Sequence, residues 1–259
     1  PHRPPTRTTP DPGRRTIAAD GYPGRDDDAR HLPARRPPLT SSSGAFPTMT
    51  LFGLVRHGQT DYNLRGLFQG SSDIPLNATG REQAHHALDG APDIAWDAAV
   101  SSPLGRAEET GRIIAEDHGI PFVGTDPRLT EIDWGAAEGH DVAEMEARYP
   151  GRAFPGREGL QAVADRGYLA LDDLAERFPD QNVLVVAHGT FIRLLLSGVT
   201  GTHLPSIPNG ALSLLRHEGE SWQVEMIAGE AAEEPARTAP VGASPRFPLS
   251  EHHLRPYGL

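Results

Sequence analysis

The sequence contains no cysteine and no lysine. Without cysteine, the chain cannot form disulfide bonds or zinc–thiolate sites, and it cannot use a thiol nucleophile. Without lysine, a Schiff-base mechanism and the lysine of a P-loop are excluded as well. All 24 basic residues are therefore arginines. Any cationic site must consist of guanidinium groups, which stay charged and can bind phosphate oxygens in pairs.

Long apolar runs are also missing. No stretch approaches the roughly 20 apolar residues of a membrane span, and residues 1–48 lack the apolar run of a signal peptide. We therefore expect a cytoplasmic protein without a membrane partner. Residues 49–229 carry 13 Arg against 26 acidic residues, which argues against nucleic acid as a partner. An anionic ligand must then enter through a local cationic pocket.

Three segments differ in composition. Residues 1–48 hold 10 of the 25 prolines and show no apolar periodicity, so we predict a disordered, Pro/Arg-rich extension. Because Met49 opens the first convincing strand, we suspect that this extension lies upstream of the true coding start. Residues 230–259 have a similar composition and predict a disordered tail. The predicted folded domain is 49–229.

Strands alternate with helices along this predicted domain. We predict strands at 50–55, 98–101, 121–124, 182–187, 211–216 and 222–227, the last two as a hairpin, and helices at 78–88, 104–118, 142–149, 160–178 and 191–199. This order indicates an α/β domain in which helices cover both faces of a largely parallel sheet.

Two of the predicted strands run directly into a His-Gly pair. Strand 50–55 leads into Arg56-His57-Gly58, and strand 182–187 leads into His188-Gly189. If the strands are neighbours, both imidazoles emerge at the sheet edge where such folds bind ligands. A neutral imidazole is a competent nucleophile toward phosphorus, and the preceding arginine fits two phosphate oxygens. Taken alone, each histidine has another reading, a strand-end ring that only hydrogen-bonds a carbonyl.

Several ordered blocks of the sequence resemble the histidine phosphatase superfamily, which includes the cofactor-dependent phosphoglycerate mutases. The blocks cover nearly all of residues 50–217 and lie at 54–63, 69–70, 76–84, 101–110, 129–139 and 185–189. The resemblance implies a phosphoglycerate mutase-like fold, which is a three-layer α/β/α sandwich with a mostly parallel central sheet.

The resemblance also implies catalytic roles. His57 would be the phosphorylated nucleophile, with Arg56, Arg106 and His188 around the phosphoryl group. Glu131 would protonate the leaving oxygen and later activate water, which suits a carboxyl beside a dianion. Two arginines and a protonated histidine would stabilise the developing charge. The remaining substrate-binding positions that the resemblance implies are Gly58, Asn63, Gln69, Gly70 and Gly189.

Some of these roles have alternatives in the sequence. Asp133 or Glu138 could be the acid in place of Glu131. Arg106 could be an exposed helix residue that pairs with Glu109 or Glu108. Asn209, followed by Gly210, predicts a plain turn, although the family often has a similar pair there.

A metal site is a further alternative, because His57, His188 and Glu131 form a known zinc set. It would leave both arginines unexplained, so we expect neither a metal nor a cofactor.

Three functions remain open at this stage. The first is a phosphatase acting on small phosphorylated metabolites, the second a mutase, and the third an inactive module that binds phospho-ligands. The absence of lysine and of an Arg-Arg pair in 141–150 favours the phosphatase. Arg157 and Gly159 depart from the Pro-Gly-Gly-Glu-Ser motif of many phosphatase members, so Arg157 either reads an anionic part of the substrate or points to solvent. The sequence indicates no oligomeric state.

Overall fold

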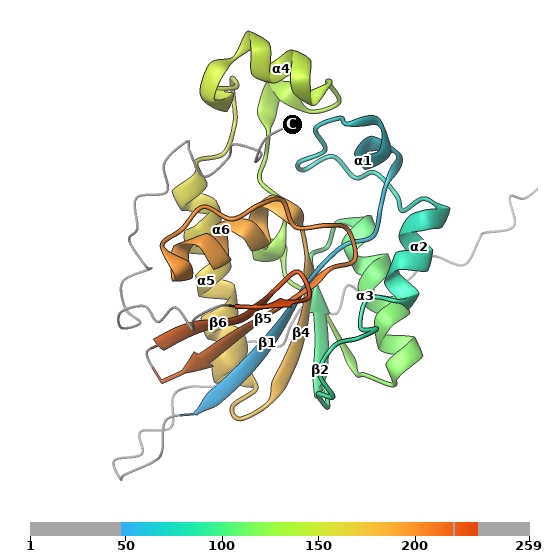
Figure 1. The fold of residues 1–259 in the computed structure, drawn as a ribbon, viewed down its shortest axis with the longest axis vertical. Helices are drawn as coiled ribbons and strands as arrows, with labels where there is room; N and C mark the ends of the chain where they lie inside the picture. Colours follow the sequence, from blue (N-terminus) through green and yellow to red (C-terminus); the bar gives the residue numbers. More distant parts are fainter. Residues whose placement is uncertain (1–47, 220, 233–259) are drawn as a thin grey trace, which may run out of the picture. The chain divides into compact units, whose positions relative to one another are not determined.

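The computed structural model describes residues 48–219 and 221–232, which contain a seven-stranded mixed sheet (Figure 1). The strand order is β3(Phe122–Thr125), β2(Ala98–Ser101), β4(Asn182–Ala187), β1(Met49–Arg56), β5(Leu212–Glu218), β6(Ser221–Ile227) and β7(Glu230–Ala231). The first four strands are mutually parallel, and β5 to β7 add antiparallel pairings. The predicted α/β sandwich is confirmed, and its parallel part is the half that ends at the two His-Gly pairs.

The helices follow the predicted order. Their bounds are α1(Asp61–Arg65), α2(Ala78–His85), α3(Gly105–His118), α4(Val142–Arg148), α5(Leu160–Arg177) and α6(Gly189–Thr200). Helix α1 was not predicted, because five residues are too few to show a period. Its ends are nevertheless encoded: Thr60 and Asn63 form a capping box, and Gly66 closes the helix in the left-handed conformation.

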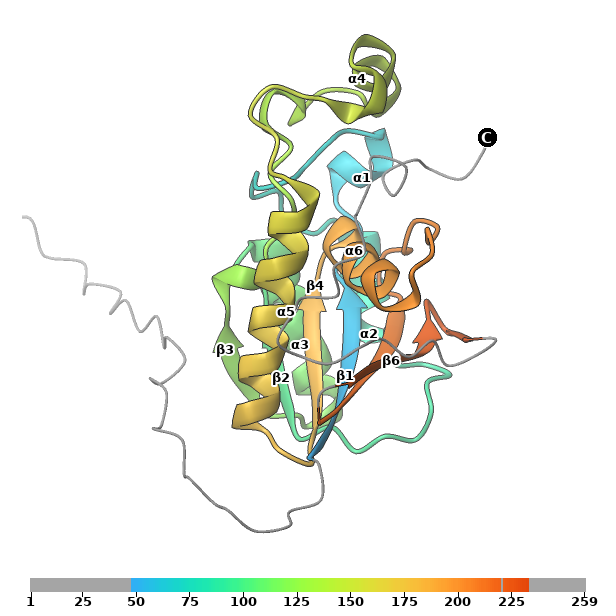
Figure 2. The same ribbon diagram turned by 90° about the vertical axis from the view of Figure 1, so that its left-hand side faces the viewer.

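Each face of the sheet is covered by its own pair of helices (Figure 2). Successive residues of β1 point to opposite faces, so Phe52 and Leu54 join the core beneath α5 and α6, whereas Leu51 and Val55 join the core beneath α2 and α3. Strand β4 alternates in the same way. Both faces of the parallel strands are therefore covered by apolar cores, and the carboxyl ends of the strands are where polar groups can gather.

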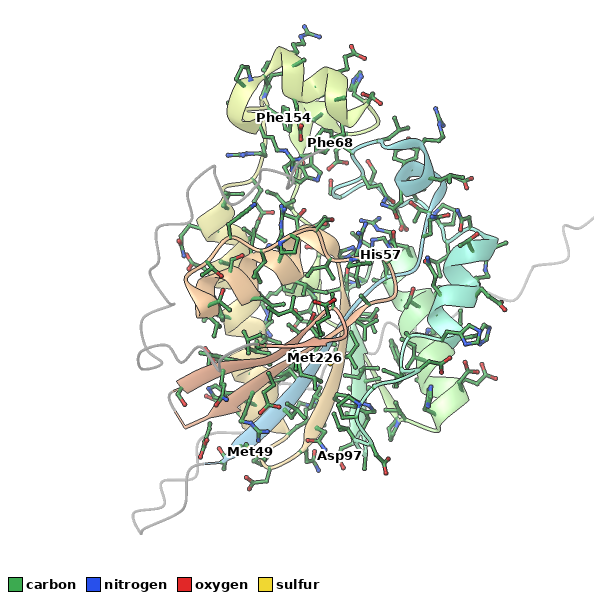
Figure 3. The ribbon with its side chains drawn as sticks, in the orientation of Figure 1. Met49, His57, Phe68, Asp97, Phe154 and Met226 are labelled. Carbon is green, nitrogen blue, oxygen red and sulfur yellow. The ribbon has the colours of Figure 1, made fainter. Side chains whose placement is uncertain are left out.

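A cluster of aromatic rings lies beyond these carboxyl ends. The ring of Phe68 packs against Trp134 and Phe154, with centroids 5.0 and 5.1 Å apart, and Tyr149 packs on Phe154. Figure 3 shows Phe68 and Phe154 above His57, next to α4. The cluster fixes residues 134–154 over the end of the sheet, and we call this segment the cap.

The predicted extension and tail fall almost wholly outside the described residues, so their disorder stays a prediction. None of the described helices combines the length and the apolarity that a membrane span requires.

Two leucines of α5 allow a matched test of the packing. Leu171 is fully buried, whereas Leu169 is 59% exposed. We expect Leu171→Ala to lower the free energy of unfolding by about 2–5 kcal/mol, since it leaves a cavity. Leu169→Ala should stay within about 0.5 kcal/mol. Urea unfolding followed by circular dichroism measures both, and equal losses would contradict the described packing.

Candidate active site

The pairing of β1 with β4 brings the two His-Gly pairs together. Arg56 lies opposite Ala187 in the parallel register, and the His57 amide donates to the Ala187 carbonyl at 3.0 Å. Both strands therefore end at the same level. The imidazole rings of His57 and His188 lie edge to face, with centroids 5.1 Å apart and almost no exposure. The spatial convergence expected from the sequence is present.

The surroundings of His57 set its tautomer. Its Nδ1 lies 2.7 Å from the carbonyl oxygen of Gly58. A carbonyl can only accept, so Nδ1 carries the proton and Nε2 presents its lone pair to the site. Gly58 holds this carbonyl in place: its amide donates to Thr110 Oγ1, and a Cβ on it would lie 2.1 Å from the Gly80 carbonyl oxygen. Close packing on Gly80 therefore requires glycine at position 58.

Arg106 is the second residue of α3 and is completely buried. Its Nη1 and Nη2 donate to the carbonyls of Ser72 and Gly70, both at 2.7 Å, and its Nε lies 3.3 Å from His57 Nε2. The alternative of an exposed helix residue is wrong, because Arg106 is buried. Glu109 and Glu108 pair with Arg81 and Arg112 instead.

Glu138 organises the loop that holds Arg106. Its carboxylate accepts hydrogen bonds from the backbone and hydroxyl groups of Ser71 and Ser72 and from the amide of Trp134. Gly70 is required beside it, since a Cβ there would lie 2.0 Å from Glu138 Oε1. Both oxygens of Glu138 therefore hold the loop that carries Ser71 and Ser72.

Two buried nitrogens in the site lack a partner among the described residues. They are Nε of Arg56 and Nδ1 of His188. Arg56 Nη1 donates to the Ile207 carbonyl, and His188 Nε2 lies 2.8 Å from Ser102 Oγ. Gly189 leaves space at Arg56, since a Cβ on it would lie 3.0 Å from that Nε. Buried polar atoms are almost always hydrogen-bonded, so this pair indicates a site for a polar ligand.

Burial and positive charge keep both imidazoles neutral. Burial lowers the pKa of His57 well below 6.5, and the charges of Arg106 and Arg56 lower it further. The pKa of His188 is lowered in the same way, by burial first and then by Arg106. The protonated form of His188 that we expected concerns a complex with phosphate, and it stays a prediction. Burial also lowers the pKa of Arg56, to about 10, so the guanidinium stays charged at neutral pH.

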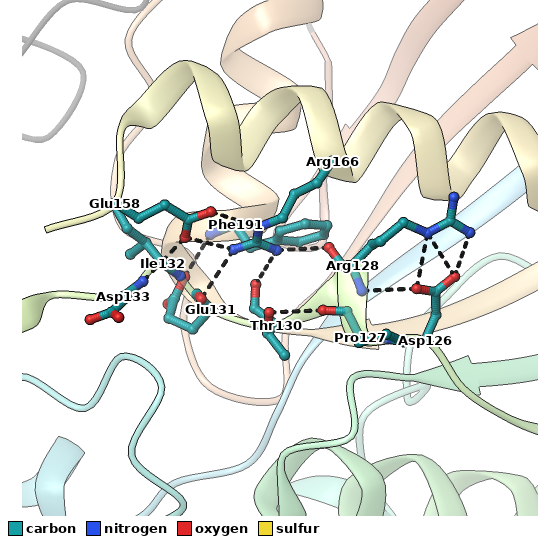
Figure 4. Close-up of polar contacts among 10 residues, drawn as sticks. All are labelled: Asp126, Pro127, Arg128, Thr130, Glu131, Ile132, Asp133, Glu158, Arg166 and Phe191. Carbon is teal, nitrogen blue, oxygen red and sulfur yellow. Dashed lines mark hydrogen bonds and ion pairs between the residues drawn. The ribbon is translucent and has the colours of Figure 1, made fainter. Parts of the chain in front are cut away.

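The carboxylate of Glu131 lies at the amino end of α6. Its Oε1 accepts from the amides of Phe191 and Ile132 at 2.9 and 3.0 Å (Figure 4). Its Oε2 accepts from the Thr190 amide at 3.1 Å. It therefore satisfies two unpaired amides of the helix that follows His188. Asp133 is exposed and closes a turn with the Gly135 amide, so the geometry favours Glu131 as the acid.

Arg166 of α5 anchors the segment that carries Glu131. Its guanidinium donates to the carbonyls of Arg128, Thr130 and Glu131, at 2.7, 2.7 and 3.1 Å (Figure 4). It also pairs with Glu158, whose Oε2 accepts from the Asp133 amide. Glu158 connects the divergent 154–159 segment to this loop.

Asn63 lies next to Asn209, which contacts the backbone of His57. Its Oδ1 accepts from the Thr60 amide and from Asn209 Nδ2, both at 3.2 Å, which assigns Nδ2 as the free end of the side chain. Asn209 also donates to the His57 carbonyl at 3.0 Å, so it is more than the plain turn that we predicted. Gln69 Oε1 accepts from the Thr60 hydroxyl at 2.8 Å.

Among the described residues, no group of three His, Asp or Glu side chains is arranged to hold a metal ion.

The family model of the histidine phosphatase superfamily (branch 1) matches residues 52–229. The chain belongs to this superfamily. It is 40% identical over 181 residues to PhoE of Bacillus subtilis (strain 168), described as an uncharacterized phosphatase; the match covers 68% of this chain and 93% of PhoE. It is 33% identical over 187 residues to GpmB of Enterobacter sp. (strain 638), a probable phosphoglycerate mutase, with 65% and 86% covered. The solved structure of Bacillus stearothermophilus YhfR matches with a TM-score of 0.63 at 26% identity, covering 71% of this chain and 98% of YhfR.

Sequence reasoning missed three residues of this histidine phosphatase site. Ser102 and Arg166 contact functional groups through side chains whose direction no sequence pattern indicates. Glu138 was considered only as a rival acid, because a carboxylate in a loop does not reveal which amides it accepts. For Asn209 a signal existed in the Asn-Gly pair, but it indicates a turn more directly than a contact with His57.

The depressed histidine pKa values predict how stability depends on pH. Unfolded rings have a pKa of about 6.5 and so bind protons at higher pH than the folded rings. The stability that neutral His57 and His188 contribute is therefore fully present above about pH 6.5 and is lost as the pH falls below it. We expect urea unfolding in phosphate-free buffer to show this loss between pH 7.5 and 5. His57→Asn should make the dependence shallower, and an unchanged dependence would contradict the burial of a neutral ring.

Proposed function

We propose that this histidine phosphatase hydrolyses phosphomonoesters of small metabolites through a phosphohistidine on His57. The observation that carries the proposal is the unprotonated Nε2 of His57, which lies beside two charged guanidinium groups and an unpartnered imidazole nitrogen. Such a set is complementary to a phosphoryl group in transfer, whose charge spreads over three oxygens.

In the first step, Nε2 of His57 attacks phosphorus and the bond to the leaving oxygen breaks. Glu131, protonated, gives its proton to that oxygen, so the alcohol leaves neutral. Oε2 is the oxygen suited to this transfer, because it accepts a single hydrogen bond in the structure, from Thr190.

In the second step, water attacks phosphorus and the P–N bond breaks. The Glu131 carboxylate takes the proton of the water, and inorganic phosphate leaves with His57 neutral again. Proton and charge are thereby restored, and no cofactor is required.

The anion-binding groups surround the path of transfer. Arg56, Arg106 and Asn63 Nδ2 supply donors to the oxygens, and the free Nδ1 of His188 supplies another once it carries a proton. A bound dianion favours that protonation, since an opposite charge stabilises the imidazolium. The cationic form of His188 that we expected from the sequence thus belongs to the complex.

A mutase is the second candidate, and the 33% identity to a probable phosphoglycerate mutase favours it. A mutase must return the phosphoryl group to another hydroxyl before water arrives. Incubation with 3-phosphoglycerate separates the two reactions: a phosphatase releases inorganic phosphate, whereas a mutase forms 2-phosphoglycerate. An inactive binding module would do neither.

The acid role of Glu131 predicts a dependence on the leaving group. We expect Glu131→Gln to lower kcat about 10²- to 10⁴-fold on an alkyl phosphate such as glycerol 3-phosphate. The loss should be smaller on p-nitrophenyl phosphate, whose leaving group needs no proton. Asp133→Asn is the matched control on the same loop and should lower neither rate by more than a few-fold.

The nucleophile is tested by trapping the phosphoenzyme. Brief incubation with a phosphate donor followed by alkaline denaturation should retain an acid-labile phosphoryl group on the wild type and none on His57→Ala, which should also lack turnover. Turnover by His57→Ala, or an equal Glu131→Gln loss on both substrates, would overturn the assigned roles.

A further inference from the structure

The two imidazoles of the site have different roles in the proposed reaction, and each role requires a different ring atom. His57, the nucleophile, must present a lone pair, whereas His188 must present an N–H to a phosphoryl oxygen. A neutral imidazole has one nitrogen of each kind, so its tautomer decides which kind faces the ligand. For His57 the carbonyl of Gly58 fixes the tautomer. The opposite arrangement at His188 requires another group.

Ser102 lies directly against the second imidazole. Its Oγ is 2.8 Å from His188 Nε2, and both residues are fully buried. The other ring nitrogen, Nδ1, is also buried and has no partner among the described residues. Ser102 therefore occupies one nitrogen of the ring, and Nδ1 is the nitrogen left for a ligand.

The backbone holds Ser102 in this position. Ser102 directly follows β2, and its amide donates to the Val186 carbonyl of β4 at 2.9 Å, two residues before His188. Strand β4 pairs with β2 on one side and with β1 on the other. Three neighbouring strands thus lead into Ser102, His188 and His57, with His188 on the central one.

The hydrogen bonds of Ser102 indicate where its hydroxyl proton lies. Its Oγ accepts from the Leu104 amide at 3.3 Å. Within the part of the chain that the structure describes, Oγ makes one further hydrogen bond, with His188 Nε2. If Nε2 carried the ring proton, the hydroxyl proton would be buried without an acceptor, which is costly. Donation from the hydroxyl to Nε2 satisfies both groups and leaves the proton of the neutral ring on Nδ1.

This choice matters because the ring is neutral in the free protein. Burial lowers the pKa of His188, and the charge of Arg106 lowers it further. A free imidazole in water favours the tautomer with its proton on Nε2. In that form Nδ1 would direct a lone pair at the phosphoryl oxygens, and the contact would be repulsive. A group that keeps the proton on Nδ1 therefore prepares the site before the substrate arrives.

We propose that Ser102 is a positioning residue, which donates to His188 Nε2 and so keeps an N–H on Nδ1 as a donor to the transferred phosphoryl group. The inference rests on the proposed phosphatase reaction and specifies how one of its anion-binding groups is prepared. When a bound dianion brings a second proton to the ring, that proton lies on Nε2, and the hydroxyl turns to accept it. Ser102 thus serves both forms of His188.

The first test observes the tautomer in the free protein. NMR spectra of protein with isotope-labelled histidine, in phosphate-free buffer above the ordinary pKa of the ring, distinguish a protonated from an unprotonated ring nitrogen. His188→Gln identifies the His188 signals by their loss. We expect a proton on Nδ1 of His188 in the wild type, and its transfer mainly to Nε2 in Ser102→Ala. Ser101→Ala is the matched control, because it removes an equally buried hydroxyl that donates to a backbone carbonyl, and it should keep the wild-type tautomer.

The second test measures the effect of the tautomer on binding and turnover. Calorimetry with inorganic phosphate reports binding, and p-nitrophenyl phosphate reports turnover. Ser102→Ala should weaken phosphate binding and lower kcat/KM about 10- to 100-fold, because the donor is misdirected rather than removed. Ser101→Ala should stay within a few-fold of the wild type in both measurements.

Three results would overturn the inference. The first is a wild type in which Nδ1 of His188 carries no proton in the free protein, a measurement that requires no Ser102 variant and no turnover. The second is a Ser102→Ala variant that keeps the wild-type tautomer but loses activity, as a residue that only supports the turn before α3 would. The third is a changed tautomer with unchanged phosphate binding and kcat/KM. A wild type that has the expected tautomer but hydrolyses no phosphoester would instead contradict the proposed function.

Discussion

The register between β1 and β4 is the constraint on which the site depends. Arg56 of β1 lies opposite Ala187 of β4, and the next residue after each of them is a histidine. Both histidines therefore leave the sheet at the same level. A shift by one residue would send one ring to the opposite face of the sheet. Both faces are covered by apolar side chains, so a slipped register would also place the side chains of the shifted strand in the wrong core. The hydrophobic cores thus fix the catalytic geometry.

The site holds more positive charge than its surroundings balance. Arg106 and Arg193 are buried and Arg56 is half-buried, and burial lowers the pKa of each. The neutral histidines show the same effect, since both would be protonated more readily in water. An arrangement of desolvated cations is costly in the free protein and becomes favourable when an anion enters. An acidic chain can therefore bind a phosphate ester, because the attraction is local and strengthened by the low dielectric of the site.

The sequence predicted the elements that show a regular apolar pattern or that stop at a recognisable motif. The strand before His57 and the strand before His188 are buried runs that stop at a His-Gly pair, and the parallel topology brings such ends together. Arg106 and Glu131 were located through the resemblance, whereas their contacts were not. A guanidinium that binds the carbonyls of Gly70 and Ser72 has no signature in the sequence, because the loop conformation depends on Glu138, 66 or more residues away. Arg166 was missed for the same reason: it recognises backbone carbonyls, which every residue has.

Helix α6 connects two functional groups of the proposed site. His188 precedes its first turn, and the amides of Thr190 and Phe191 hold Glu131. Four residues of helix rise by about 6 Å, and a packed helix keeps that distance fixed. The separation between His188 and the carboxylate of Glu131 is then set by one rigid element, and the same helix that orients the imidazole also holds the carboxylate.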